Sequence, residues 1–220
     1  MASKKPTPAA VIAKPVKKTC VVAVAKAVTR GTNGKPTNVP FPELMIDLET
    51  GDTTARAAIV SIGAVRFGEK EFCKETFYRA ITLDSNIKAG RTISGSTLGW
   101  HMKQDDEVRA VFNDPQAIPL AQALNDLRKF IGEPLVAKNT KVWGNGAVFD
   151  IAILNDAYVY VMDELPPWEF WNIKCFRTIK DSEFGRKVTK PANMLAHNAL
   201  ADALAQAEHL QLIWAVGYPR

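Results

Sequence analysis

The chain has 220 residues, 47% of them hydrophobic and 23% charged, which is sufficient for one domain with a substantial core. Its net charge of +5 is unevenly spread. Residues 1–40 hold eight basic residues and no acid, whereas residues 41–220 hold 20 basic residues and 23 acids. No apolar run approaches the ~20 residues that a bilayer-spanning helix needs, which argues against a membrane protein.

The first 40 residues form an arm rich in Lys, Ala and Pro. Its five prolines interrupt any helix, so we expect the arm to be disordered and separate from a folded domain over residues 41–220. The arm is either a solubilising tail or a tether for a polyanion, since Lys-rich arms bind nucleic acid by releasing counterions.

Three cysteines, Cys20, Cys73 and Cys175, show no paired spacing and cannot all pair within one chain. They fit a reducing compartment better than a disulfide framework, which predicts a cytoplasmic protein. The apolar run at residues 20–25 is short and flanked by lysines, unlike a secretion signal.

Three strand patterns follow the arm in close succession. Residues 44–50, 57–67 and 75–81 are rich in β-branched or aromatic side chains. Because their connections are short, we predict an antiparallel meander.

Helical patterns and one further strand follow the meander. The helices are predicted at residues 96–103, 105–112, 119–131, from about 148, and at 198–215. The strand, residues 141–143, runs into the turn Gly144-Asn145-Gly146. This order predicts an α/β fold with a mixed sheet and helices on its faces.

Two carboxylates lie two residues apart in the apolar run MIDLETG, at Asp47 and Glu49. In a strand they share one face, with Cα atoms ~6.6 Å apart, while Leu44, Ile46 and Leu48 point the other way. A divalent cation would relieve their repulsion, and Mg²⁺ favours carboxylate oxygen. Acidic pairs also occur on solvated strands, so the pattern indicates a metal site only together with further acids.

Asp150 follows the Gly-Asn-Gly turn, in the first turn of its predicted helix. An acid there also suits the helix dipole, which is an equally good structural explanation. The turn would aim Asp150 at the carboxyl end of the sheet, where α/β proteins gather their sites.

Asp202 lies off the apolar stripe of the last helix, and His197 stands just before the predicted cap, Asn198. A lone histidine before a helix is usually a cap or a packing residue, and we assign His101 and His209 to that class. His197 differs because an acid follows five residues later.

Taken in order, Asp47, Glu49, Asp150, His197 and Asp202 resemble the DEDDh group of 3′→5′ exonucleases. In that group Asp-x-Glu comes first, the second Asp follows a Gly/Asn turn, and the third motif is His-x-Ala-x-x-Asp. The stretches AAIVSIGAVRF, STLGWHMKQDDEVR, VWGNGAVFDIAIL and PPWEFWNIKCFRTIK are similar to a narrower set, the small phage and bacterial exodeoxyribonuclease VIII-like exonucleases. The resemblance covers residues 43–216 and implies a ribonuclease H-like fold.

This resemblance also implies two Mg²⁺ or Mn²⁺ ions at the scissile phosphate, ~3.5–4 Å apart. Asp47, Glu49 and Asp202 would hold the ion that carries the attacking water. Asp47 would bridge to the second ion, which Asp150 would support through water. His197, with an ordinary pKa near ~6.5, would take the proton of the water at neutral pH.

The implied activity is hydrolysis of nucleic-acid 3′ ends to nucleoside monophosphates. The phage-type resemblance favours DNA, as single strands or frayed ends, and relatives in this fold often form homodimers. The alternatives are an exoribonuclease, an endonuclease of the same fold, and a nucleic-acid-binding module without catalysis. Aromatic residues could stack bases or fill the core: Trp100, Trp168, Phe170 and Trp171.

Overall fold

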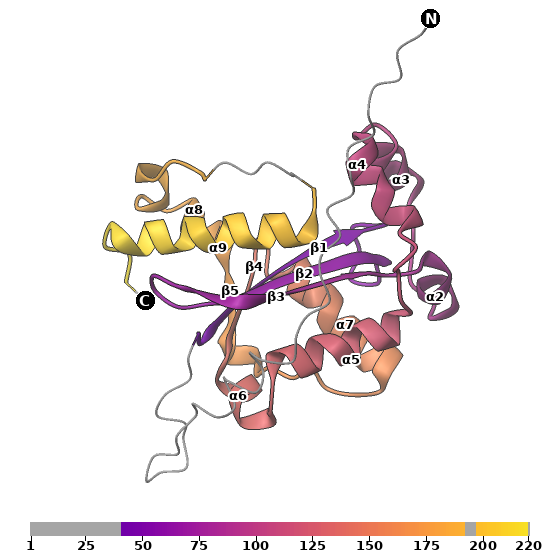
Figure 1. The fold of residues 1–220 in the computed structure, drawn as a ribbon, viewed down its shortest axis with the longest axis horizontal. Helices are drawn as coiled ribbons and strands as arrows, with labels where there is room; N and C mark the ends of the chain where they lie inside the picture. The colour runs from indigo at the N-terminus through magenta and orange to yellow at the C-terminus, as the bar shows by residue number, and fades with distance from the viewer. Residues whose placement is uncertain (1–40, 192–196, 220) are drawn as a thin grey trace, which may run out of the picture.

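Five strands form one mixed sheet, in the order β3-β2-β1-β4-β5, in the computed structural model, which describes residues 41–191 and 197–219 (Figure 1). The strands are β1 (Glu43–Thr50), β2 (Ile59–Phe67), β3 (Phe72–Ala80), β4 (Lys141–Gly144) and β5 (Ile173–Cys175). β2 is antiparallel to both β1 and β3, whereas β4 runs parallel to β1 and to β5. The predicted meander and α/β class are therefore confirmed. The predicted arm lies outside the described residues.

Eight α-helices occur in the described part of the chain. They are α2 (Leu83–Lys88), α3 (Gly95–His101), α4 (Asp106–Arg109), α5 (Leu120–Ile131), α6 (Pro134–Asn139), α7 (Asp150–Met162), α8 (Phe176–Lys180) and α9 (Ala199–Ala215). The helix predicted at 105–112 is wrong in its second half, because α4 gives way to a 3₁₀ helix, Ala110–Asn113. None of the described helices combines the length and apolar character of a membrane span.

Helices cover both faces of the sheet (Figure 1). One core joins the sheet to α5 and α7, and the other joins it to α8 and α9. The alternation predicted for β1 is confirmed, since Leu44, Ile46 and Leu48 lie in the first core. Met45 lies in the second core, on the α9 side of the sheet.

Gly63 on β2 allows the start of α9 to lie directly against the sheet. A Cβ atom at Gly63 would be 2.2 Å from the carbonyl carbon of Ala199 and from the amide nitrogen of Leu200. Gly63 is paired with Asp47 across the β1–β2 ladder. This close approach brings the first turn of α9 beside the acidic end of β1.

Buried polar side chains fix the end of β1. Nε2 of His101 lies 2.9 Å from the carbonyl oxygen of Thr50, so the ring donates from Nε2. Arg91 donates to the carbonyls of Ala57 and Ile153 and pairs with Asp156 at 2.8 Å. The loop after β1 is therefore tied to α7, the helix that begins with Asp150. His101 has the packing role predicted for it.

Cys73 on β3 is disulfide-bonded, whereas Cys175 is a free thiol. The expectation that the cysteines are reduced is therefore wrong for Cys73.

The aromatic segment before β5 divides between core and surface. Trp168 is buried and its ring lies edge-on to Tyr158, 5.8 Å away. Phe170 and Trp171 are exposed. Core packing is thus the role of Trp168 alone.

Candidate functional site

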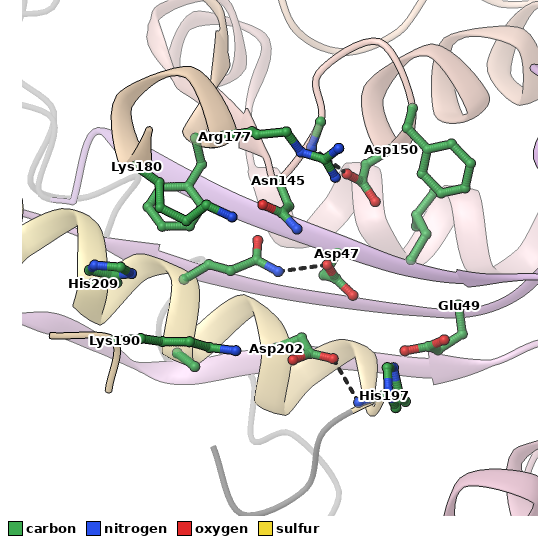
Figure 2. Close-up of a pocket in the computed structure, with 16 residues that line it drawn as sticks. Asp47, Glu49, Asn145, Asp150, Arg177, Lys180, Lys190, His197, Asp202 and His209 are labelled. Carbon is green, nitrogen blue, oxygen red and sulfur yellow. Dashed lines mark hydrogen bonds between the residues drawn. The ribbon is translucent and has the colours of Figure 1, made fainter. Parts of the chain in front are cut away.

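A cavity of about 340 Å³ opens where the carboxyl ends of β1 and β4 meet α9 (Figure 2). All five residues singled out from the sequence line it: Asp47, Glu49, Asp150, His197 and Asp202. They come from β1, from the start of α7 and from the start of α9. Residues more than 150 positions apart in the chain therefore share one cavity.

The two acids of β1 are largely buried, each with 9% of its surface exposed. Burial raises the pKa of Asp47 well above its usual value, and the charge of Asp150 raises it further. Burial, followed by the charges of Asp202 and Asp150, raises the pKa of Glu49 to about 8. Burial and the neighbouring acids thus both disfavour the ionised forms of Asp47 and Glu49.

Asp150 is the first residue of α7, two residues later than the helix start predicted from the sequence. Its Oδ2 accepts a 3.2 Å hydrogen bond from the backbone N–H of Gly146, in the turn after β4. Burial raises the pKa of Asp150 to about 6, although backbone N–H groups and the guanidinium of Arg177 oppose the rise. The Gly-Asn-Gly turn therefore positions this carboxylate by backbone contact.

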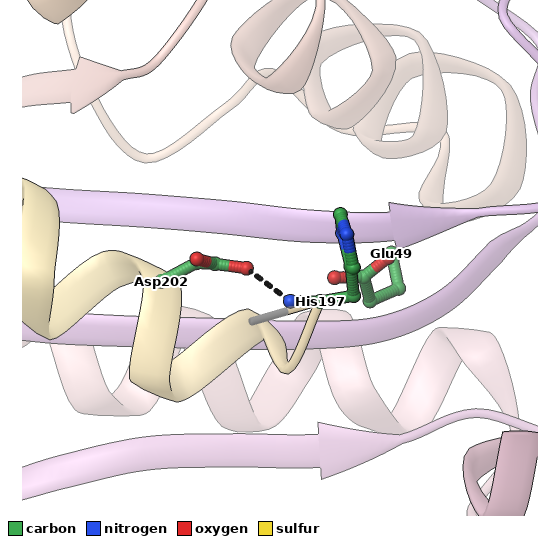
Figure 3. A group of neighbouring side chains, drawn as sticks. All are labelled: Glu49, His197 and Asp202. Atoms are coloured by element: carbon green, nitrogen blue, oxygen red, sulfur yellow. Dashed lines mark hydrogen bonds between the residues drawn. The ribbon is translucent and has the colours of Figure 1, made fainter. Parts of the chain in front are cut away.

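His197, just before the cap of α9, has an unusual backbone conformation. Its φ is +66°, in the left-handed region, which few residues with a Cβ adopt. The N–H of His197 donates to Oδ2 of Asp202 at 2.9 Å, and Asn198 caps the helix by accepting from the N–H of Ala201 (Figure 3). The predicted cap is confirmed. Asp202 therefore supports the backbone turn that presents the imidazole.

Three side chains approach closely enough to share a metal ion. One possible ligand atom from each of Glu49, His197 and Asp202 lies within 4.8 Å of the other two (Figure 3). Among the described residues, neither Asp47 nor Asp150 belongs to a group this tight, although both line the cavity. Carboxylate oxygens, one pair of them on the buried Glu49 with its raised pKa, form a donor set that fits a hard divalent cation.

The ring of Trp100 on α3 lies edge-on to that of His197, with centroids 4.8 Å apart. Its side chain is partly exposed. Trp100 therefore limits the orientations of the imidazole and forms one wall beside it.

Comparison with known families gives a match over most of the chain. The model of the family described as "3'-5' exoribonuclease Rv2179c-like domain" matches residues 42–214. The chain belongs to this family. The expectation of a 3′→5′ exonuclease family is confirmed, while the DEDDh subtype and the exodeoxyribonuclease VIII-like set stay predictions.

Among solved structures, "Exonuclease X in complex with 5' overhanging duplex DNA" is similar to this Rv2179c-like chain. The two are 18% identical with a TM-score of 0.49, and the match covers 80% of this chain and 92% of that chain. No curated protein matches the chain.

Several residues that line the cavity were not predicted from the sequence. They are the polar and basic residues Asn145, Arg177, Lys180, Lys190, Gln206 and His209. Gln206 has a recognisable signal, because it lies four residues after Asp202 on the same face of α9. The assignment of His209 to packing alone is incomplete, since the buried ring also lines the cavity.

Proposed function

We propose that the protein is a divalent-metal-dependent 3′→5′ exonuclease that releases nucleoside monophosphates from polynucleotide ends. One observation carries the proposal: four acids and a histidine line a single cavity in a member of a 3′→5′ exonuclease family. Each acid is buried or partly buried, so a bound cation would stabilise the ionised forms of the cluster.

Asp47, Glu49 and Asp202 would hold the metal ions, and Asp150 would assist from the start of α7. When bound, the ions would stabilise negative charge on the phosphate and on the leaving oxygen. Asp47 is prepared for this role by the Nε2 amide group of Gln206, which fixes one carboxylate oxygen at 2.7 Å.

His197 is exposed at the mouth of the cavity and has neighbours that orient it. Asp202 holds its backbone N–H, and Trp100 lies against its ring. A neutral imidazole can accept a proton from water at neutral pH. We assign His197 as the general base that activates the attacking water.

RNA is the substrate that family membership favours, because the matching family is described as an exoribonuclease. This departs from the preference for DNA that the phage-type resemblance suggested. RNA and DNA differ at the 2′ position, so contacts to the 2′-hydroxyl would decide between them.

The direct test uses matched RNA and DNA oligonucleotides, labelled at the 5′ end, incubated with the protein in Mg²⁺ or Mn²⁺. We expect ladders that shorten from the 3′ end, with RNA degraded faster than DNA. Asp202→Asn is the control and should give no ladder. Faster degradation of DNA would show that DNA is the preferred substrate.

Two other outcomes would overturn the proposal. Opening of a circular oligonucleotide would show an endonuclease, because a circle has no end. Binding without release of nucleotides in either metal would show a binding module that has lost catalysis.

A further inference from the structure

The candidate cavity extends beyond the carboxylates, along α9 towards its carboxyl end. Asp202 and His209 both line it, and their separation of seven positions along the helix corresponds to a rise of ~10 Å. At the His209 end the lining residues include Lys180, from the end of α8, and Lys190. The same cavity therefore has an acidic part near Asp202 and a basic part near His209.

Lys180 and Lys190 have no salt-bridge partner within 4.0 Å among the described residues, whereas five other lysines do. Figure 2 shows both side chains reaching along the cavity from the side where His209 lies. Two ammonium groups that share a cavity and form no salt bridge repel each other, and an anion between them would offset that repulsion.

His209 gives independent evidence that this end of the cavity accepts a polar ligand. The residue is 4% exposed, its ring lies edge-on to Phe176 at 5.6 Å, and its Nε2 atom has no hydrogen-bond partner. Burial lowers the pKa of His209, and the charges of Lys180 and Lys190 lower it further. Both ammonium groups thus act on the same buried ring, whose free nitrogen is unfavourable unless a ligand or water meets it.

The chemistry of 3′→5′ hydrolysis limits which anion can occupy this place. The water oxygen bonds to phosphorus, and the bond from phosphorus to the 3′ oxygen of the retained strand breaks. That oxygen gains one proton and becomes the new 3′-hydroxyl, while the other proton stays with the phosphate or passes to solvent. The released nucleotide takes the scissile phosphate with it and has no other, so a second phosphate can come only from the retained strand.

We propose that Lys180 and Lys190 form a subsite for the phosphate next to the scissile one, on the retained strand of the substrate. This inference rests on the proposed exonuclease function. It predicts a preference for substrates with at least two phosphodiester linkages, because a dinucleotide leaves the subsite empty.

The test compares three substrates in Mg²⁺ with the full-length protein: a dinucleotide, a trinucleotide, and the same trinucleotide with a neutral methylphosphonate at its 5′-side linkage. For the unmodified protein we expect a KM about tenfold lower for the trinucleotide than for the dinucleotide. The methylphosphonate should remove most of this advantage, because it keeps the shape of the linkage and loses its charge.

The double variant Lys180→Gln/Lys190→Gln should lose the advantage of the trinucleotide, and the methylphosphonate should then have little further effect. The matched control is Lys187→Gln, since Lys187 lies between the two lysines in sequence but pairs with Glu183. This control should keep the full advantage. The dependence of log KM on log salt for the trinucleotide should fall by ~0.7 in the double variant.

Two results overturn the subsite while leaving the exonuclease intact: equal KM values for dinucleotide and trinucleotide, or an undiminished advantage in the double variant. If the unmodified protein cleaves none of the three substrates, the proposed function fails instead. In that case the affinities of the two trinucleotides are compared by equilibrium competition against a labelled oligonucleotide. Equal affinities would reject the phosphate subsite.

Discussion

Nε2 of Gln206 on α9 donates a 2.7 Å hydrogen bond to Oδ1 of Asp47 on β1, joining residues 159 positions apart. The bond connects the last helix to the first strand in the centre of the candidate site. It also fixes one of the two oxygens with which Asp47 would bind metal.

Gln206→Met keeps the approximate length of the side chain and removes the donor. Because groups that orient metal ligands typically contribute 10–100-fold, we expect kcat or metal affinity to fall by about that factor. Metal titration of activity measures both quantities. Gln211→Met is the control, since Gln211 lies on the same helix but donates to the carbonyl of Gly68. Equal activities of the two variants would exclude the orienting role.

Replacing His197 tests the assignment of the base separately from the left-handed backbone. His197→Asn retains a residue that tolerates φ of +66° and removes the imidazole. We expect kcat to fall by about 10²–10⁴ with a small change in KM. His197→Gly, which suits the backbone better still, should be equally impaired. If the single-turnover rates of these variants are near that of the unmodified protein, His197 is not the general base.

The raised pKa of Glu49 makes stability depend on pH. In the folded protein this pKa is about 8, whereas the ordinary pKa of a glutamate side chain is 4.5. A raised pKa means that the contribution is complete below the unfolded value and is lost as pH rises through the folded one. The free energy of unfolding of the metal-free protein should therefore fall from about pH 5 to about pH 8.

Urea unfolding in EDTA and in Mg²⁺ measures this effect. Mg²⁺ should reverse the fall, since it binds the ionised carboxylates. Glu49→Gln cannot ionise and should make the fall in EDTA shallower, leaving the part that comes from the raised pKa values of Asp47 and Asp150. A slope unchanged by this substitution would mean that Glu49 has an ordinary pKa in the folded state.

Gly63→Ala places a methyl group where the backbone of Ala199 and Leu200 now lies. Because neither backbone segment can rotate away as a side chain would, we expect a loss of more than about 3 kcal/mol in the free energy of unfolding. Gly99→Ala in α3 is the control: its new methyl group meets no atom within 4 Å, and alanine favours the helix. Chemical denaturation of the two variants should shift in opposite directions.

Deletion of residues 1–40 tests the proposed tether. The arm holds eight basic residues and no acid. If it binds polynucleotides, its loss should weaken binding and reduce the salt slope by ~0.7–0.9 for each phosphate contact removed. Equal salt slopes for the full-length and the shortened protein would leave the arm with a solubilising role.

The strands and helices with strong sequence periodicity are the ones that the sequence predicts well. β1 places Leu44, Ile46 and Leu48 on one face and Asp47 and Glu49 on the other, and α9 repeats its apolar stripe over 17 residues. Both elements contribute acids to the cavity, so the acidic part of the site follows from patterns that sequence reasoning can detect.

The basic part of the cavity could not be predicted in the same way. Arg177 and Lys180 lie on α8, which has five residues, and β5 before it has three. Elements this short contain fewer than two helical turns or strand repeats, so they have no measurable period. Lys190 lies outside any helix or strand, and only the folded chain places it opposite α9.

The distance along the chain between Asp47 and Asp202 has a consequence for the cell. During translation β1 is made before α9, so a growing polypeptide exposes Asp47 and Glu49 well before Asp202 exists. Under the proposed function, a nascent chain without α9 would not hydrolyse the mRNA that encodes it. Activity would begin only when α9 has emerged and packed against Gly63.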